Sequence, residues 1–235
     1  MISRIGIIGD VHARHEELAS ALHCLQDAGV DLCLCTGDLV DGVGDVDACV
    51  ELLQAFNVRV VRGNHDRWLL QNKARHVADA HFAADLSQTS YDYLAGLPIE
   101  LRFETSAGPL LLCHGVGQND LAKVWPGSER MPPERSTRLD ELIADGEIRW
   151  LINGHMHYRT IIHFQQLTLI NAGTLKPTHR PGFSLLDLNS RDLTGYEFHP
   201  QPQAVCAVNL SDEPPRVFHN SQEFDGQWQP LVLYP

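Results

Sequence analysis

The stretch at residues 5–12, Ile-Gly-Ile-Ile-Gly-Asp-Val-His, decides how this chain folds. Its apolar first half predicts a short buried strand, and the glycine that follows permits a sharp turn into the polar residues Asp10 and His12. A helical pattern follows over residues 15–28 and ends at Gly29. A strand followed by a helix is the repeating unit of α/β folds, so the start of the chain predicts an α/β fold.

The same unit recurs in the first two thirds of the chain. Residues 31–35 predict a second strand, residues 45–56 a second helix and residues 58–61 a third strand. The helical signal over residues 67–97 is weaker and ends at Pro98. We therefore expect an α/β architecture in which the front half contains many parallel strand pairings.

Strands dominate the back half of the sequence. Two are expected at residues 101–103 and 110–113, on either side of a turn at Gly108 and Pro109. One helix is expected at residues 137–143. Further strands are predicted at residues 148–152, 160–164, 167–170 and 183–188. Their quick succession favours antiparallel hairpins, so the predicted fold class is mixed, α/β with α+β character.

The last part of the chain has a different composition. Beyond Pro200 it is rich in Pro, Gln, Asn and Asp, with isolated apolar residues. We see no linker and no internal repeat, and therefore predict a single domain over residues 1–235. Residues 200–235 are expected to form an irregular C-terminal cover.

Charge and hydropathy exclude several classes of protein. The 18 basic and 30 acidic residues give a net charge of −12, and no five like charges run together, which argues against nucleic acid as a partner. No apolar run approaches the ~18 to 20 residues of a membrane helix, and no signal peptide opens the sequence. We expect a cytoplasmic protein without a membrane partner, whose six cysteines are small core residues.

Five predicted strands run directly into residues that can bind a metal. In α/β sheets, ligands bind outside the carboxyl ends of the strands, so these segments could meet at one site. The segments are Gly9-Asp10-Val11-His12, Gly37-Asp38-Leu39-Val40-Asp41, Gly63-Asn64-His65-Asp66, Cys113-His114-Gly115 and Gly154-His155-Met156-His157.

The ligand types in these segments suit two metal ions. The candidates are Asp10, His12, Asp38, Asn64, His114, His155 and His157. Seven side chains are too many for one tetrahedral ion and fit two divalent cations with a bridging carboxylate, for which Asp38 is the natural choice. Two such ions can hold a hydroxide and clamp a phosphoryl oxygen, which points to hydrolysis of a phosphoester.

Each segment taken alone has a plainer explanation. A Gly-Asp pair after a strand is commonly only a turn. A lone His114 is more often a structural histidine, and the pair His155 and His157 could sit on an exposed hairpin. The conjunction of five such strand ends in one chain is what favours a functional site.

This ordered set of segments resembles the calcineurin-like metallophosphoesterase superfamily, and the resemblance spans residues 9–157. The later segment Asn171-Ala172-Gly173-Thr174 is similar to a loop of small bacterial members. The resemblance implies two mixed β-sheets packed face to face as a sandwich flanked by helices, in four layers. The set is specific for the superfamily and not for a substrate.

The resemblance also implies a role for each residue. Asp10, His12, Asp38 and His157 would hold one ion, while Asp38, Asn64, His114 and His155 would hold the other. His65 would protonate the leaving oxygen, with Asp66 orienting or tuning it. If the segment is extended, His65 points away from Asn64.

Contacts to the substrate phosphate are less well defined by the sequence. Protein Ser/Thr phosphatases and diadenosine tetraphosphatases of this superfamily carry a phosphate-holding Arg after the second Asp, where this chain has Gly42-Val43-Gly44. Arg62 could supply a cation or be structural, and Lys176, His179 and Arg180 are alternative phosphate contacts. The other histidines are expected to be surface or packing residues: His15, His23, His76, His81, His163, His199 and His219.

The function that these observations favour is dinuclear-metal hydrolysis of a small phosphomonoester or phosphodiester, such as a nucleotide, by in-line attack of a metal-bridging hydroxide. Mn, Fe and Zn all fit mixed nitrogen and oxygen ligands, and the oligomeric state stays open. The alternatives are a nuclease, a diadenosine tetraphosphatase, a protein Ser/Thr phosphatase, or a non-catalytic metal-binding scaffold like the retromer subunit of the superfamily. That relative lacks the histidine corresponding to His65, so the presence of His65 argues for catalysis.

Overall fold

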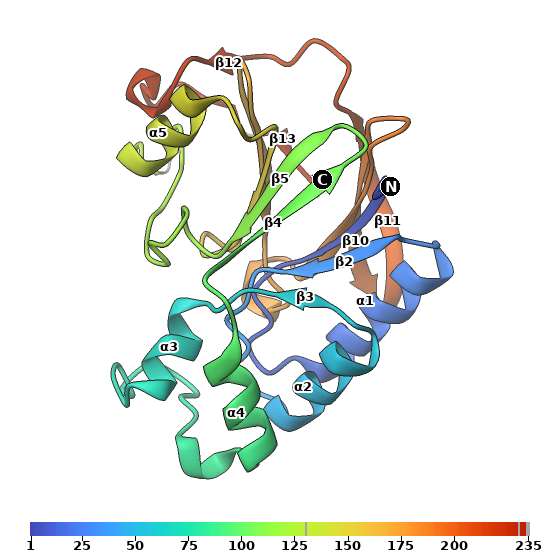
Figure 1. Cartoon of the computed structure of the whole chain (residues 1–235), viewed down its shortest axis with the longest axis vertical. Coiled ribbons are helices and arrows are strands. Elements are labelled where there is room, and N and C mark those ends of the chain that lie inside the picture. The colour runs from blue at the N-terminus through green and yellow to red at the C-terminus, as the bar shows by residue number, and fades with distance from the viewer. Residues whose placement is uncertain (130, 230, 234–235) are drawn as a thin grey trace.

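The computed structural model describes residues 1–129, 131–229 and 231–233 and contains two β-sheets packed face to face (Figure 1). Four of the labelled helices lie on the outer side of one sheet, and α5 (Thr137–Asp145) lies on the outer side of the other. The predicted mixed α/β class and the sandwich with outer helices are therefore confirmed.

The first sheet has six strands and carries the parallel pairings of the front half. Its strands are β1 (Arg4–Ile8), β2 (Leu32–Cys35), β3 (Arg59–Val60), β9 (Gly182–Asp187), β10 (Asp192–His199) and β11 (Gln201–Asn209). They lie in the order β11-β10-β9-β1-β2-β3. β1, β2 and β3 are parallel, whereas β9, β10 and β11 are joined antiparallel.

The second sheet has seven strands in the order β12-β7-β8-β6-β5-β4, with β13 also pairing with β7. They are β4 (Glu100–Thr105), β5 (Gly108–Cys113), β6 (Trp150–Asn153), β7 (Arg159–Phe164), β8 (Thr168–Ala172), β12 (Val217–Phe218) and β13 (Leu231–Val232). β6 pairs parallel with both β5 and β8, so the back half is less antiparallel than predicted. The turn between β4 and β5 lies at residues 106–107, because Gly108 and Pro109 already belong to β5.

The helices of the first layer are α1 (His15–Asp27), α2 (Val46–Ala55), α3 (Asn64–Leu70) and α4 (Gln88–Gly96). The weak helical signal over residues 67–97 corresponds to two helices, since α3 and α4 are separated by residues 71–87. Asn72, Ala74 and Asp79 interrupt the helix there because each has a left-handed backbone. Short 3₁₀ turns occur at Ala83–Asp85, Pro177–His179 and Ser221–Glu223.

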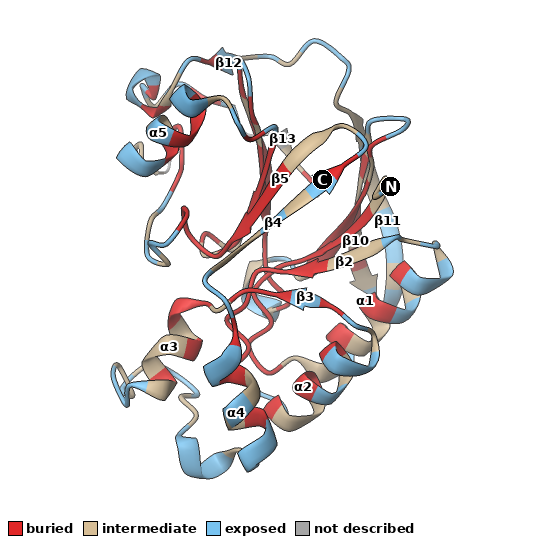
Figure 2. Cartoon of the chain, viewed as in Figure 1, coloured by how far each residue is buried: buried red, intermediate tan, exposed pale blue. Residues whose placement is uncertain are grey.

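Successive side chains of a strand point to opposite faces of its sheet and so belong to different layers of the core. Figure 2 shows the buried residues of both sheets. In β1, Ile5 and Ile7 belong to the apolar layer between the sheets, whereas Ile8 packs toward the helices. Leu110 and Ile152 of the second sheet contribute to the same central layer. Burial on both faces explains why these strands are continuous apolar runs in the sequence.

The C-terminal segment is more regular than predicted. β11 extends the first sheet by pairing with β10 and stands at its edge, where Pro202 costs no ladder hydrogen bond. β12 and β13 both pair with β7. The prediction of an irregular cover over residues 200–235 is therefore wrong for these strands, whereas Phe218, Phe224 and Trp228 do cover the second sheet. The longest described helix, α1, has 13 residues, so no helix in the described ranges reaches the length needed to cross a bilayer.

Candidate metal centre

The predicted ligands come together where the carboxyl ends of strands from both sheets meet. Asp10 follows β1 and Asp38 follows β2 in the first sheet. His114 follows β5 and His155 follows β6 in the second sheet. Asn64 opens α3, directly after the loop that leaves β3. Strands far apart in the sequence thus deliver the polar side chains to one place.

One set of ligands, which we call the Asp10 group, consists of Asp10, His12, Asp38 and His157. One potential ligand atom from each lies within 4.8 Å of all the others. The Nε2 atoms of His12 and His157 are 3.2 Å apart, and His157 Nε2 is 3.3 Å from Asp10 Oδ2. His12 Nδ1 donates to the carbonyl oxygen of Asp41 at 2.9 Å. The Nε2 atom of neutral His12 therefore carries a free lone pair that faces the group.

A second set, the Asn64 group, consists of Asp38, Asn64, His114 and His155. His114 Nε2 lies 3.0 Å from Asn64 Oδ1 and 3.3 Å from Asp38 Oδ2. His155 Nδ1 lies 2.9 Å from the same Asn64 oxygen. His114 Nδ1 donates to the Thr36 carbonyl at 2.7 Å, so its Nε2 can donate only when the ring is charged. Asp38 belongs to both groups.

The electrostatics of this cluster require a positive charge. Burial disfavours the charged form of Asp38, but His114, His65 and His12 together outweigh that effect and hold the pKa of Asp38 far below its usual range. Burial likewise opposes the charged form of His114, yet the carboxylates of Asp38 and Asp10 raise its pKa to about 10. Burial lowers the pKa of His12 and of His155 to about 4, which favours neutral rings. The buried carboxylates favour a positive charge beside them, and a set of carboxylate, imidazole and amide groups fits divalent cations, which would supply that charge.

Backbone groups hold the two carboxylates in place. The His65 N–H donates to Asp38 Oδ1 at 2.8 Å, and the His155 N–H donates to Asp10 Oδ2 at 2.9 Å. Gly63 and Gly154 leave room for these oxygens. A Cβ on Gly63 would lie 2.1 Å from Asp38 Oδ1, and one on Gly154 would lie 2.2 Å from Asp10 Oδ1. Both glycines are therefore required by close approach to a candidate ligand.

Backbone strain concentrates at the same place. Left-handed φ values of non-glycine residues cost free energy and persist where the surrounding structure imposes them, which is common at functional sites. Five such residues belong to the predicted segments, namely His12 (+48°), Asp38 (+48°), Asp41 (+64°), His155 (+65°) and His157 (+60°).

His65 lies beside both groups, but its local structure differs from the prediction. Asn64 and His65 begin α3 and do not form an extended segment, because Asp66 accepts the Gly63 N–H at 2.9 Å and starts the helix there. The His65 ring centroid lies 5.1 Å from that of His12. The side chain is 19% exposed, which leaves it accessible.

The partner of the His65 ring is Asp41 and not Asp66. His65 Nδ1 lies 2.7 Å from Asp41 Oδ2. Burial opposes a charged ring, but this hydrogen bond and the charge of Asp38 raise the pKa of His65 above its usual value. Asp41 stands in the quoted Gly-Asp segment, and only the tertiary structure reveals its partner.

Asp66, which was predicted to orient or tune the His65 ring, directs its carboxylate at backbone groups. Its carboxylate accepts backbone N–H groups of Leu39 at 2.7 Å and Val40 at 3.3 Å, besides that of Gly63. Asp66 thus ties the loop after β2 to the start of α3, and only its charge acts on the ring. Burial and the charge of Asp38 raise the pKa of Asp66 to about 7.

The predicted phosphate contacts have different surroundings. His179 lies next to the Asp10 group, with its ring centroid 5.0 Å from that of His157. Burial, His157 and the charge of Lys176 lower the pKa of His179. Arg180 Nη1 faces Glu197 at 3.9 Å. Arg62 lies two residues after β3, where its backbone N–H donates to the Pro98 carbonyl at 2.8 Å.

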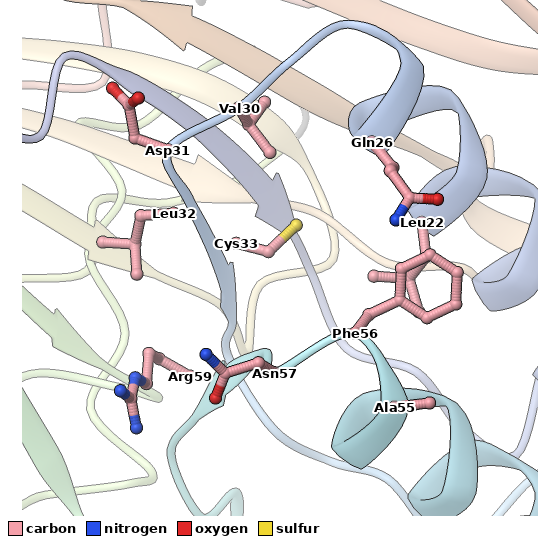
Figure 3. A pocket seen from close by; sticks show the side chains of 10 residues that line it. All are labelled: Leu22, Gln26, Val30, Asp31, Leu32, Cys33, Ala55, Phe56, Asn57 and Arg59. Carbon is pink, nitrogen blue, oxygen red and sulfur yellow. The ribbon is translucent and has the colours of Figure 1, made fainter.

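A separate pocket of about 360 Å³ lies at the opposite ends of the strands (Figure 3). It is lined by residues that precede or begin β2, including Asp31 and Cys33, and by Phe56 after α2. None of the predicted site residues lines it. This pocket is therefore separate from the candidate metal centre.

Comparisons with known proteins agree with this geometry. The model of the calcineurin-like phosphoesterase superfamily domain matches residues 4–191. An uncharacterized protein from Methanocaldococcus jannaschii is 35% identical over 180 residues, which cover 74% of this chain and 70% of that protein.

Two solved structures share the fold. A hypothetical protein from Pyrococcus horikoshii OT3 superposes with a TM-score of 0.62 at 16% identity, covering 82% of this chain and 87% of that one. A metallophosphoesterase from Sphaerobacter thermophilus superposes with a TM-score of 0.57 at 22% identity, covering 83% of this chain and 87% of that one.

Proposed function

Because this chain belongs to the calcineurin-like phosphoesterase superfamily, we propose that it hydrolyses a small phosphomonoester or phosphodiester with two divalent metal ions. The observation that carries the proposal is the pair of ligand groups that share Asp38. A shared carboxylate is the arrangement by which two cations are held close to each other.

The metal ligands in this proposal are the members of the two groups. Asp10, His12, Asp38 and His157 would hold one cation, and Asp38, Asn64, His114 and His155 the other. Manganese, iron and zinc all accept such mixed nitrogen and oxygen donors. When bound, the two cations would supply Lewis-acid stabilisation of phosphoryl charge and would lower the pKa of water.

The protein itself contributes a proton donor in this proposal. His65 would donate to the oxygen that leaves phosphorus, because its ring is accessible and lies beside His12 of the Asp10 group. The hydrogen bond from Nδ1 to Asp41 leaves Nε2 as the nitrogen that can deliver the proton. Lys176 and His179 would contact phosphate oxygens, since His179 packs against the ring of His157.

Two features support a small substrate over the alternatives. The net charge of −12 opposes binding of a long polyanion, and two divalent cations would reduce it only to about −8. The site where related phosphatases carry a phosphate-holding Arg is Gly42, whose Cβ would lie 2.1 Å from the His12 carbonyl oxygen. A side chain at that position would require the backbone to move, which argues against diadenosine tetraphosphatase and protein Ser/Thr phosphatase activity.

The experiment that tests the proposal compares three substrates on one preparation. Protein stripped with chelator and reconstituted with Mn²⁺ is given an aryl phosphomonoester, the matched aryl phosphodiester and a dinucleoside polyphosphate. We expect hydrolysis of one of the first two that disappears on metal removal and returns on reconstitution. A preference for the dinucleoside polyphosphate would replace the small-ester assignment. Two bound ions without hydrolysis of any substrate would favour a non-catalytic scaffold and overturn the proposal.

A further inference from the structure

Asp41 is a fully buried carboxylate that receives more donors than the His65 ring alone provides. Arg75 Nη1 donates to Asp41 Oδ1 at 2.8 Å, and Arg75 Nη2 donates to Asp41 Oδ2 at 2.9 Å. The backbone N–H of His81 donates to Asp41 Oδ1 at 3.0 Å. Both carboxylate oxygens are thereby fixed, so the plane of the carboxylate cannot rotate freely.

The segment that carries Arg75 and His81 is itself tied to the same point. The Asp41 N–H donates to His81 Nδ1 at 3.0 Å, so His81 contacts Asp41 through two of its own atoms. Arg75 Nη1 also donates to the His81 carbonyl at 2.6 Å, and Arg75 Nε donates to the Lys73 carbonyl at 2.8 Å. The sequence predicted only a surface or packing role for His81. Through these contacts, residues 73–81 hold Asp41 in place.

We propose that Arg75 is a positioning residue for the His65 ring, acting through Asp41. The inference rests on the proposed function, in which His65 donates a proton to the leaving oxygen. A ring held only by one hydrogen bond to a mobile carboxylate could turn away from the substrate. Bidentate pairing with Arg75 fixes the carboxylate oxygen that His65 Nδ1 contacts, and therefore fixes the direction of Nε2.

Holding both oxygens of the Asp41 carboxylate requires arginine. Its planar guanidinium can contact both carboxylate oxygens and still donate to the main chain, whereas lysine offers a single charged nitrogen. The Arg75 side chain is only 10% exposed, so its charge is directed at Asp41 and is largely shielded from water. Arg75→Lys should therefore keep the charge and lose part of the orientation.

The first test measures the dependence of rate on the leaving group. The assay uses two aryl esters, one with a basic and one with a weakly basic leaving oxygen. It compares the variants Arg75→Gln and Arg75→Lys with the control Arg216→Gln. The control breaks a bidentate pair with Asp225 that is remote from His65. We expect Arg75→Gln to lower kcat for the basic leaving group by about 10-fold or more and the other by less than about 3-fold, with KM and metal content unchanged. Arg75→Lys should fall between Arg75→Gln and the wild type, and Arg216→Gln should match the wild type. Equal losses on both esters, or no loss, would overturn the proposal.

The second test does not depend on activity. Nitrogen-15 NMR of the Zn²⁺-loaded protein, with the His65 signals assigned from a His65→Ala variant, reports which ring nitrogen carries the proton. We expect a single set of His65 ring signals with Nδ1 protonated in the wild type, and averaged ring signals in Arg75→Gln. Unchanged His65 signals would overturn the proposal even if no ester is hydrolysed, so its failure is distinguishable from failure of the proposed function. If Arg75→Gln does not fold, Arg75→Lys is measured in its place.

Discussion

Gly63→Ala should impair the candidate metal centre more than it impairs the stability of the fold. The backbone of Gly63 (φ −85°, ψ 175°) suits any residue, so only the added methyl group matters. The new Cβ would lie 2.1 Å from Asp38 Oδ1 and 2.4 Å from Asp38 N. Ordinary contacts are about 3.5 Å, so the loop after β2 and the start of α3 must separate by more than about 1 Å.

The cost of that separation can be estimated. Overpacking a rigid site costs ~1 to 3 kcal/mol, and contact with a backbone atom places this variant near the upper value. In a chain of this size ~3 kcal/mol lowers Tm by about 6 to 12 °C. A displacement of about 1 Å at a catalytic centre can lower the rate by ~100-fold, and here it would move Asp38, the proposed bridging ligand.

Gly96→Ala is the matched control. Gly96 ends α4, and a Cβ there would meet nothing within 4 Å, so the substitution should leave Tm unchanged or raise it slightly. Metal content by elemental analysis, Tm by calorimetry and kcat/KM on the preferred ester are measured for both variants and the wild type. Two ions per chain and kcat/KM within about 3-fold of wild type in Gly63→Ala would refute the reasoning.

Four further substitutions address individual roles. Asp38→Asn should bind fewer than two metal ions per chain and reduce kcat by ~1000-fold or more, because Asp38 belongs to both groups. Elemental analysis and kinetics measure the two effects. Two bound ions together with the full rate would exclude Asp38 from the centre. His65→Ala should keep both ions and slow esters with basic leaving oxygens more than others, and an equal loss on both, seen in paired kinetics, would argue against a proton donor. Lys176→Ala should raise KM several-fold with little change in kcat. Arg180→Ala should change neither KM nor kcat, because the Arg180 guanidinium faces Glu197. Steady-state kinetics of both variants test these two expectations.

The layers of the fold were accessible from local patterns in the sequence. Apolar runs such as residues 5–8 mark strands that are buried on both faces, and amphipathic spacing marked α1 and α2 to within two residues. β11 was missed because its side chains are only partly buried and an edge strand tolerates Pro202. Partial burial weakens the period-two signal on which strand prediction depends.

The helix that carries His65 shows a different limit. Gly-Asn-His-Asp after a strand is compatible with an extended turn, and the spacing of Gly63 and Asp66, three positions apart, is its local signal for a helix start. The helix begins because the Asp66 carboxylate accepts the Gly63 N–H and also holds the backbone of Leu39, 27 positions earlier in the chain. That long-range contact is invisible to a local pattern.

The candidate ligands were readable from the sequence alone, because each follows a strand and carboxyl ends of parallel strands converge on one edge of a sheet. The sequence also determined the fold class, through the period of its apolar residues. What only the tertiary structure decided is which neighbours those side chains meet. Asp41 pairs with His65 and with Arg75, 24 and 34 positions away, and Asp66 pairs with backbone. Such pairings arise from packing of loops, and loops carry no periodic signal that could predict them.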